Sequence, residues 1–214
     1  MKEQLLILGS LFYSHLSLSL VALLVGILIS IPLGVWVSHQ KRWQNLVLGF
    51  SGVIQTIPGL ALLAIMVPIL GTVSDWSETN FNYKFSSIGT LPALLALILY
   101  SLLPILRNTV TGIAGIDEDL IEAADAVGMT PKQKLFKVEL IMAMPVIFAG
   151  IRTATIWVIG LATLATPVGA PSLGNIIFSG PPGVGKTTLV EIISLKTRSN
   201  LKKLKSFGYK IIGP

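Results

Sequence analysis

The sequence lacks cysteine altogether and contains few charged residues. Without cysteine, a disulfide framework is excluded. Charged residues make up only 12% of the 214 residues, whereas a soluble domain carries about 25%. The two histidines, His15 and His39, form no cluster with Asp or Glu at metal-ligand spacing, and no Ser-His-Asp set is evident. These absences argue against a catalytic centre in the first 170 residues, and we expect a protein that is not an enzyme.

Long stretches without Lys, Arg, Asp or Glu dominate the chain. They cover residues 4–40, 43–74, 85–106 and 153–185. A membrane-spanning helix needs about 20 mostly apolar residues, so each stretch can hold one span. We place the spans at roughly 16–37, 47–70, 88–106 and 145–167, and we interpret the first as a retained helix rather than a signal peptide. The sequence therefore predicts an all-α polytopic membrane protein with about four to five spans.

The basic residues of the short loops predict the orientation. They lie in loops 38–46 and 107–144, which the positive-inside rule places in the cytoplasm. The N-terminus and loop 71–87 then lie outside a cell membrane that the chain crosses several times. The formal charge of +6 comes entirely from residues 181–214, because the basic and acidic residues of 1–180 balance. The positive net charge therefore does not indicate nucleic-acid binding, and we expect no nucleic-acid partner.

The loop 107–144 contains signals for two short helices. Asp117 is a candidate N-cap for a helix over 118–127, and Gly128 is a candidate terminator. Thr130 and Pro131 are suited to open a second helix as its cap and first residue. On the first helix, Ile121, Ala124, Asp125 and Gly128 share one face at helical spacing. Small residues there predict a shallow face on which another protein can dock.

The same loop resembles a known family. Glu122-Ala123-Ala124, then Gly128, then Val138-Glu139-Leu140, resembles the EAA loop of binding-protein-dependent ABC importer permeases. The resemblance implies a MetI-like helix bundle, apparently truncated, whose EAA loop docks on a separate cytoplasmic ABC ATPase. The family usually has proline directly after the Leu, whereas this chain has Ile141 there and a proline only at Pro145. The resemblance assigns the docking to Glu122, Ala123, Ala124 and Gly128.

Two further segments narrow the resemblance. "QTIPGLALLAIMVPILG" and "LPALLALILYSLLPILRNTVTGI" look like the osmoprotectant subfamily, which imports glycine betaine, carnitine or choline. This likeness covers about residues 12–180, with "TVSDWSETNFNYKFSS" as an insertion in the outer loop. It implies a second permease subunit, identical or different, an extracellular solute-binding protein, and membrane lipids around the permease. ATP would be used by the partner ATPase, and this chain would hold no cofactor.

The C-terminal segment carries a different motif. Residues 180–187 match the phosphate-binding loop pattern G-x-x-x-x-G-K-[ST], with Gly180, Gly185, Lys186 and Thr187 as candidate nucleotide-binding residues. "NIIFSG" before the loop is a candidate strand, and "KTTLVEIISLKT" after it is a candidate helix. The segment resembles the Walker A start of an AAA-type ATPase.

Several observations oppose a working nucleotide site there. Glu191 is the only acid after Thr187, so Mg²⁺ would lack the usual Walker B aspartate. The family resemblance also gives "PSLGNIIFSG" another meaning, as the start of a further membrane span. We interpret residues 1–180 as the permease domain and 181–214 as a vestigial P-loop fragment of a chimera. Two alternatives stay open, namely a membrane-anchored P-loop NTPase and a non-functional truncated fusion product.

Overall fold

The chain folds into helices throughout the part that the computed structural model describes, residues 2–55 and 58–179. The elements are α1 (Lys2–Ser38), α2 (Lys41–Gln55), α3 (Gly59–Phe81), α4 (Thr90–Ala114), α5 (Glu118–Ala126), α6 (Pro131–Lys134), a π-helix η1 (Leu135–Glu139), α7 (Leu140–Thr163), a 3-10 turn η2 (Thr166–Val168) and α8 (Gly174–Ser179). No strand occurs among these residues. The predicted all-α fold is confirmed.

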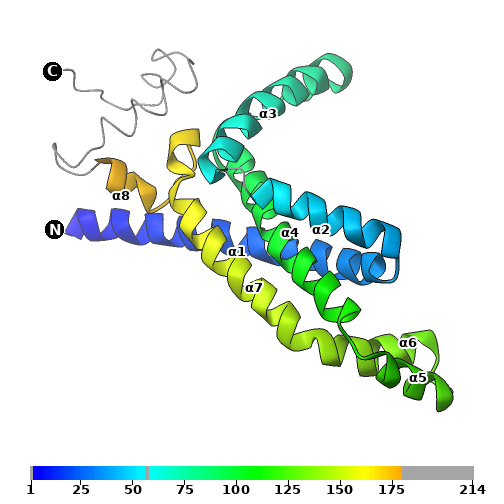
Figure 1. Ribbon diagram of the computed structural model, residues 1–214. Helices are drawn as coiled ribbons and strands as arrows, with labels where there is room; N and C mark the ends of the chain where they lie inside the picture. Colours follow the sequence, from blue (N-terminus) through cyan, green and yellow to red (C-terminus); the bar gives the residue numbers. More distant parts are fainter. Residues whose placement is uncertain (1, 56–57, 180–214) are drawn as a thin grey trace.

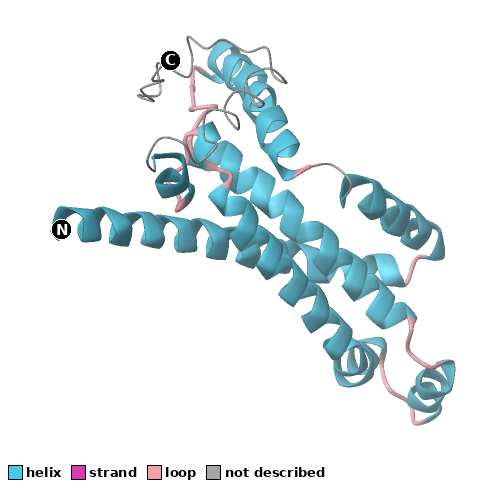
Figure 2. Cartoon of the chain, turned by 60° about the vertical axis from the view of Figure 1, so that its left-hand side comes forward, coloured by secondary structure: helices cyan, strands magenta, loops and turns pink. Residues whose placement is uncertain are grey.

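Three helices form the body of the molecule, with α4 packed against both α1 and α7 (Figure 1). Apolar side chains from all three meet in one buried cluster, which includes Ala22, Leu97 and Val158. In Figure 1, α5 and α6 lie at one end of this bundle and α3 lies towards the opposite end, and the turned view in Figure 2 shows the same all-helical bundle. The bundle therefore separates two ends of the molecule, as a membrane-spanning protein requires.

Small residues let these helices approach closely. A Cβ on Gly34 of α1 would lie 2.7 Å from the Thr109 side chain of α4, so only glycine fits there. A Cβ on Gly150 of α7 would lie 2.7 Å from Asn108 Cβ and 2.9 Å from the Pro104 carbonyl oxygen. Ser30 Oγ of α1 donates a hydrogen bond of 3.1 Å to the Leu102 carbonyl of α4. Close backbone approach and hydroxyl-to-carbonyl bonds are how membrane helices associate without a hydrophobic driving force.

Four helices are long and apolar enough to cross a membrane, among the described residues. They are Leu6–Ser38, Gly59–Phe81, Thr90–Ala114 and Pro131–Thr163. All four overlap the predicted spans, the second only over residues 59–70. The number of spans agrees with the sequence-based expectation.

The predicted second span, residues 47–70, is wrong in its boundaries. The structure has two helices there, α2 and α3, and α3 begins directly after Pro58. Proline has no N–H to donate and disfavours helical backbone before it, which explains a new helix at this point. The expected outer loop 71–87 is also shorter, because α3 continues through Asp75 and Glu78 to Phe81.

The prediction of a strand at "NIIFSG" is also wrong. Residues 174–179 form the helix α8. Ser172 Oγ accepts a hydrogen bond of 3.1 Å from the Gly174 N–H, which is the contact that an N-cap makes. A single strand would leave its N–H and C=O groups without a partner strand among the described residues, whereas a helix pairs them internally.

Candidate functional site

The site proposed from the sequence is the segment between α4 and α7, at one end of the bundle (Figure 1). Its first helix, α5, begins as the sequence predicts. The Asp117 side chain accepts a hydrogen bond of 3.1 Å from the Asp119 N–H and so caps the helix. Glu118 and Asp119 place negative charge in the first turn, where the helix dipole favours it. Local sequence alone therefore stabilises the start of this helix.

Gly128 ends α5 by adopting a backbone conformation that other residues avoid. Its φ is +76°. The Gly128 N–H donates to the Asp125 carbonyl at 2.9 Å, and the Met129 N–H donates to the Ala124 carbonyl at 3.1 Å. This pair of bonds is the Schellman motif, in which glycine is preferred because it lacks a Cβ. The predicted helix end at Gly128 is confirmed, and its reason is conformational.

The second short helix, α6, is held by a capping box and an ion pair. The Thr130 side chain accepts from the Gln133 N–H, and the Gln133 side chain accepts from the Thr130 N–H at 2.9 Å. Lys134 Nζ lies 2.7 and 2.9 Å from the two carboxylate oxygens of Asp125. This pair joins α6 to α5, so the two helices form one unit. We call residues 115–139 the EAA loop from here on.

The face of α5 that was expected to dock another protein is partly buried or paired within this chain. Ala124 is buried with 3% exposure, Ile121 is half-buried and Asp125 is engaged by Lys134. Glu122, Ala123 and Gly128 are exposed. The structure thus separates Ala124 from the other predicted docking residues, and Ala124 supports the helix from inside. The face open to a partner carries Ala123 and Glu122.

Sequence reasoning overlooked three apolar residues of the EAA loop. Leu120, Val127 and Phe136 expose 46%, 73% and 65% of their surface outside the apolar part of the bundle. Leu120 and Val127 lie seven residues apart, which places them along the same side of α5 as Ala123. Exposed apolar side chains beside a polar surface mark sites of protein–protein contact. The spacing of Leu120 and Val127 from Ala123 was the signal that could have revealed these two residues.

The EAA loop is joined rigidly to the bundle. Helix runs without a break from Pro131 through the π-helix η1 to Thr163, over 33 residues. At about 1.5 Å per residue this is about 50 Å, whereas the apolar core of a bilayer is about 30 Å thick. The α6 end therefore projects beyond the membrane. Pro145 lies inside this helix and does not end it.

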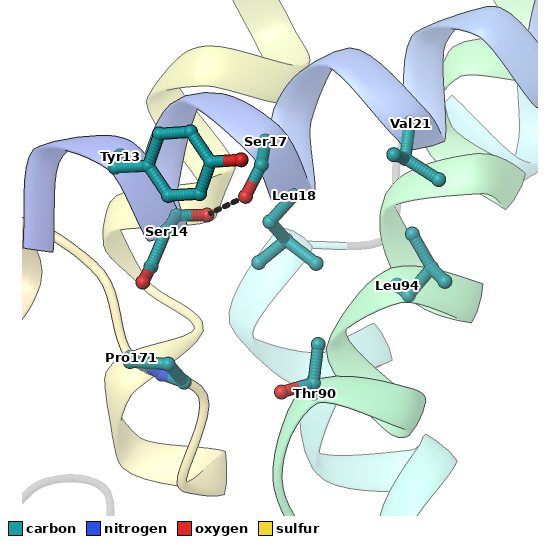
Figure 3. Close-up of a pocket in the computed structure, with 8 residues that line it drawn as sticks. All are labelled: Tyr13, Ser14, Ser17, Leu18, Val21, Thr90, Leu94 and Pro171. Atoms are coloured by element: carbon teal, nitrogen blue, oxygen red, sulfur yellow. Dashed lines mark hydrogen bonds between the residues drawn. The ribbon is translucent and has the colours of Figure 1, made fainter. Parts of the chain in front are cut away.

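The opposite end of the bundle bears a shallow hollow of about 260 Å³. Figure 3 shows Tyr13 and Ser17 of α1 facing Thr90 and Leu94 of α4 across it. Among the described residues that line it, Tyr13 is the only aromatic one. Recognition of a quaternary ammonium group generally uses several aromatic faces, so this hollow alone does not provide such a site.

The four tryptophans do not gather into a cage either. Trp36 and Trp43 pack against each other with ring centroids 6.4 Å apart. Trp76 packs against Phe81, and Trp157 packs against Tyr100. The candidate nucleotide-binding residues Gly180, Gly185, Lys186 and Thr187 lie outside the described residues.

Comparison with known proteins gives the relatives of this chain. Residues 10–183 match the family described as "Binding-protein-dependent transport system inner membrane component". The chain is 44% identical over 168 residues to the choline transport system permease protein OpuBB of Bacillus subtilis, covering 78% of this chain and 70% of that protein. It is 42% identical over 168 residues to the carnitine transport permease protein OpuCB of Listeria monocytogenes, with the same coverage of 78% and 70%.

Solved structures show a similar fold. An inward-facing structure of the MetNI methionine ABC transporter matches with a TM-score of 0.70 at 22% identity, over 92% of this chain and 93% of that one. An amino acid ABC transporter with histidines matches with a TM-score of 0.58 at 16% identity, over 97% and 87%. These structures share the arrangement of helices, which confirms the expected MetI-like bundle.

Proposed function

This chain belongs to the family of binding-protein-dependent transport system inner membrane components, and from that premise we propose that it imports small quaternary ammonium osmoprotectants. It is a membrane permease subunit. Relatives that match at 38–44% identity are named for choline, carnitine or glycine betaine transport or for osmoprotectant import, and this observation carries the proposal of the solute class. The energy would come from ATP hydrolysed by a separate ATPase.

The exposed face of the EAA loop is proposed as the ATPase-docking surface. Glu122, Ala123 and Gly128 would contact the ATPase, with Leu120 and Val127 as apolar anchors beside them. The support is geometric. Caps, the Schellman motif and the Lys134–Asp125 pair hold α5 in place, so docking costs little ordering entropy. The rigid helix from Pro131 to Thr163 would transmit a displacement of the docked helix into the bundle.

The proposed assembly contains a second permease subunit, identical or different, and an extracellular solute-binding protein. The solute pathway would lie between the two permease subunits. This fits the absence of an aromatic cage among the described residues of one chain. Residues 1–180 would form the permease domain within the membrane lipids.

The proposed orientation has the EAA loop in the cytoplasm and the N-terminus outside. Its support is that the start of α2, which contains Arg42, and the EAA loop, which contains Lys132 and Lys137, lie at the same end of the bundle (Figure 1). Single cysteines test this, because the chain has none. Tyr83→Cys should react with an impermeant maleimide from outside, and Lys132→Cys only after the membrane is opened. The reverse labelling would overturn the orientation.

The solute class is tested by reconstitution with the cognate ATPase and binding protein. We expect glycine betaine, choline or carnitine to stimulate ATP hydrolysis, and an amino acid without a quaternary ammonium group, such as methionine, to have no effect. Stimulation by methionine alone would contradict the proposed solute class while leaving the permease fold intact.

The alternative, a membrane-anchored NTPase, receives no support from the relatives. The P-loop segment is proposed to be vestigial, so the purified chain should show no saturable Mg-ATP binding and Lys186→Ala should change nothing. Saturable binding that Lys186→Ala abolishes would favour the NTPase.

A further inference from the structure

Glu139 is a buried acid at the joint between the EAA loop and the bundle. It is the last residue of the π-helix η1 and directly precedes α7, and its exposure is 5%. The 24 residues of α7 beyond it span about 36 Å, enough to cross a bilayer core of about 30 Å. Glu139 therefore lies at the membrane boundary on the side of the EAA loop. Acids are rarely buried to this extent without a partner.

The partner of Glu139 is His39, just after the end of α1. His39 Nε2 lies 3.0 Å from Glu139 Oε2. The side chain of His39 is 51% exposed and that of Glu139 only 7%. Oε2 accepts no well-aligned hydrogen bond from the described residues, so the contact with the ring is chiefly electrostatic. The stability of the contact then depends on the charges of the two groups.

The other ring nitrogen of His39, Nδ1, determines how many protons the two side chains need for an attractive contact. His39 Nδ1 lies 2.7 Å from the Val35 carbonyl oxygen, which can only accept a hydrogen bond. Nδ1 therefore carries a proton. A neutral ring would then present the lone pair of Nε2 to Glu139, and an ionised carboxylate would be repelled. An attractive contact needs one more proton, either on Nε2 or on the carboxyl group.

This non-covalent contact joins the end of α1 to the end of η1, two segments that are distant in sequence. His39 follows α1, while Glu139 is the last residue of η1, which directly follows α6 of the EAA loop. Beneath the pair, Val35 of α1 and Leu140 of α7 pack beside the buried Ile113 of α4. The C-terminal end of α1 is thereby held against the base of the EAA loop.

We propose that the His39–Glu139 contact is a proton-dependent link that positions the EAA loop relative to α1. With the bridging proton present, the two groups attract and the loop is held. As pH rises and this proton is lost, the attraction ends and a buried carboxylate is left without compensation, which favours separation. The link itself is independent of the proposed function, whereas its effect on coupling to an ATPase rests on it.

Other charged groups on the surrounding elements do not replace either partner. They are Arg42 on α2, Arg107 on α4, Asp125 on α5, Lys134 on α6 and Lys137 on η1. Among the described residues, none of these makes an ion pair with His39 or Glu139, and Asp125 and Lys134 pair with each other. The proton dependence is therefore assigned to the His39–Glu139 contact itself.

Spin labels on the full chain in lipid nanodiscs test the link. Cysteines at Gln40 and Lys132, both exposed, place one label after α1 and one on α6. We expect a narrow distance distribution at about pH 5.5 and a broader one at about pH 8.5, a range in which histidine charge can change. Glu139→Gln should remove the pH response, because an amide can donate to Nε2 or accept from it. Glu139→Leu should give the broad distribution at both pH values.

Asp125→Asn is the matched control, because it removes the EAA loop's other ion pair and should keep the pH response. An unchanged wild-type distribution at the two pH values would overturn the proposal. So would a Glu139→Gln variant with the full wild-type response. In the reconstituted importer, the solute-stimulated ATPase rate should fall towards high pH in the wild type but not in Glu139→Gln. A pH-dependent distance without a pH-dependent rate would keep the link and contradict only the proposed coupling.

Discussion

The bundle and the EAA loop are stabilised by different means. In the bundle, α1, α4 and α7 approach where side chains are missing, as at Gly34 and Gly150, and hydroxyls bond to carbonyls of the neighbouring helix. In the EAA loop, capping side chains, a left-handed glycine and a surface ion pair hold two short helices. Contacts in the bundle join residues far apart in sequence, such as Ser30 and Leu102, whereas those in the loop join residues at most nine positions apart.

This difference explains what each region contributes. The bundle gains its order from long-range packing inside the membrane and forms a stiff body. The EAA loop has its shape specified locally, so it can present an outer face without depending on a large core. Replacing a glycine by alanine should therefore destabilise each region for a different physical reason.

The largest effect is expected from Gly150→Ala in the bundle. The new Cβ would overlap Asn108 and the Pro104 carbonyl of α4, and overpacking of this kind costs about 1–3 kcal/mol. The thermal midpoint measured by tryptophan fluorescence should fall. Gly160→Ala is the matched control on α7, because a Cβ there meets nothing within 4 Å. Equal midpoints for both variants would show that close packing of α7 on α4 does not limit stability.

Gly128→Ala should have a smaller and local effect. The Cβ meets no neighbour within 4 Å, so the cost comes only from the φ of +76°, about 1–2 kcal/mol. We expect faster hydrogen exchange at the Gly128 and Met129 amides, with exchange in α4 unchanged. Faster exchange throughout the bundle would mean that the EAA loop and the bundle are not independently stabilised.

Asp125→Asn should weaken the link between α5 and α6 slightly. Surface ion pairs contribute about 0.2–1 kcal/mol, and the Asp125 side chain is 56% exposed. Hydrogen exchange of α6 amides should rise modestly and only at low salt, because salt screens the pair. An effect that persists in high salt would indicate a packing role for Asp125.

The smallest effect is expected at Lys84, at the other end of the molecule. Its hydrogen bond to Glu78 raises the pKa of Lys84. Stability from this pair is present at neutral pH and is lost as pH rises through that raised pKa. The thermal midpoints of wild type and Lys84→Gln should differ slightly at neutral pH and converge in strong alkali. A difference that grows in alkali would have the wrong sign.

The sequence predicts the EAA loop better than the bundle. Asp117, Gly128, Thr130 and Pro131 act on their immediate neighbours, so their roles could be inferred and are confirmed. The break before α3 was missed because apolar composition continues across Pro58 and conceals it.

The burial of Ala124 and the pairing of Glu139 with His39 could not be inferred. The first depends on how α5 folds back onto the following helix. The second joins residues 100 positions apart, through an approach of α1 and α7 that no local pattern encodes. The resemblance to the EAA loop assigned docking to Ala123 and Ala124 alike, and the helical-face pattern favoured Ala124, although only Ala123 is exposed.

The most direct test of the docking surface is co-purification of the cognate ATPase with two arginine variants. Ala123→Arg places a long charged side chain on the exposed face of α5, and Asn80→Arg places the same side chain on an exposed position of α3. Both should insert into the membrane normally. We predict that Ala123→Arg purifies without the ATPase and that Asn80→Arg retains it in the wild-type amount. Retention of the ATPase by Ala123→Arg would contradict docking through this face of the EAA loop.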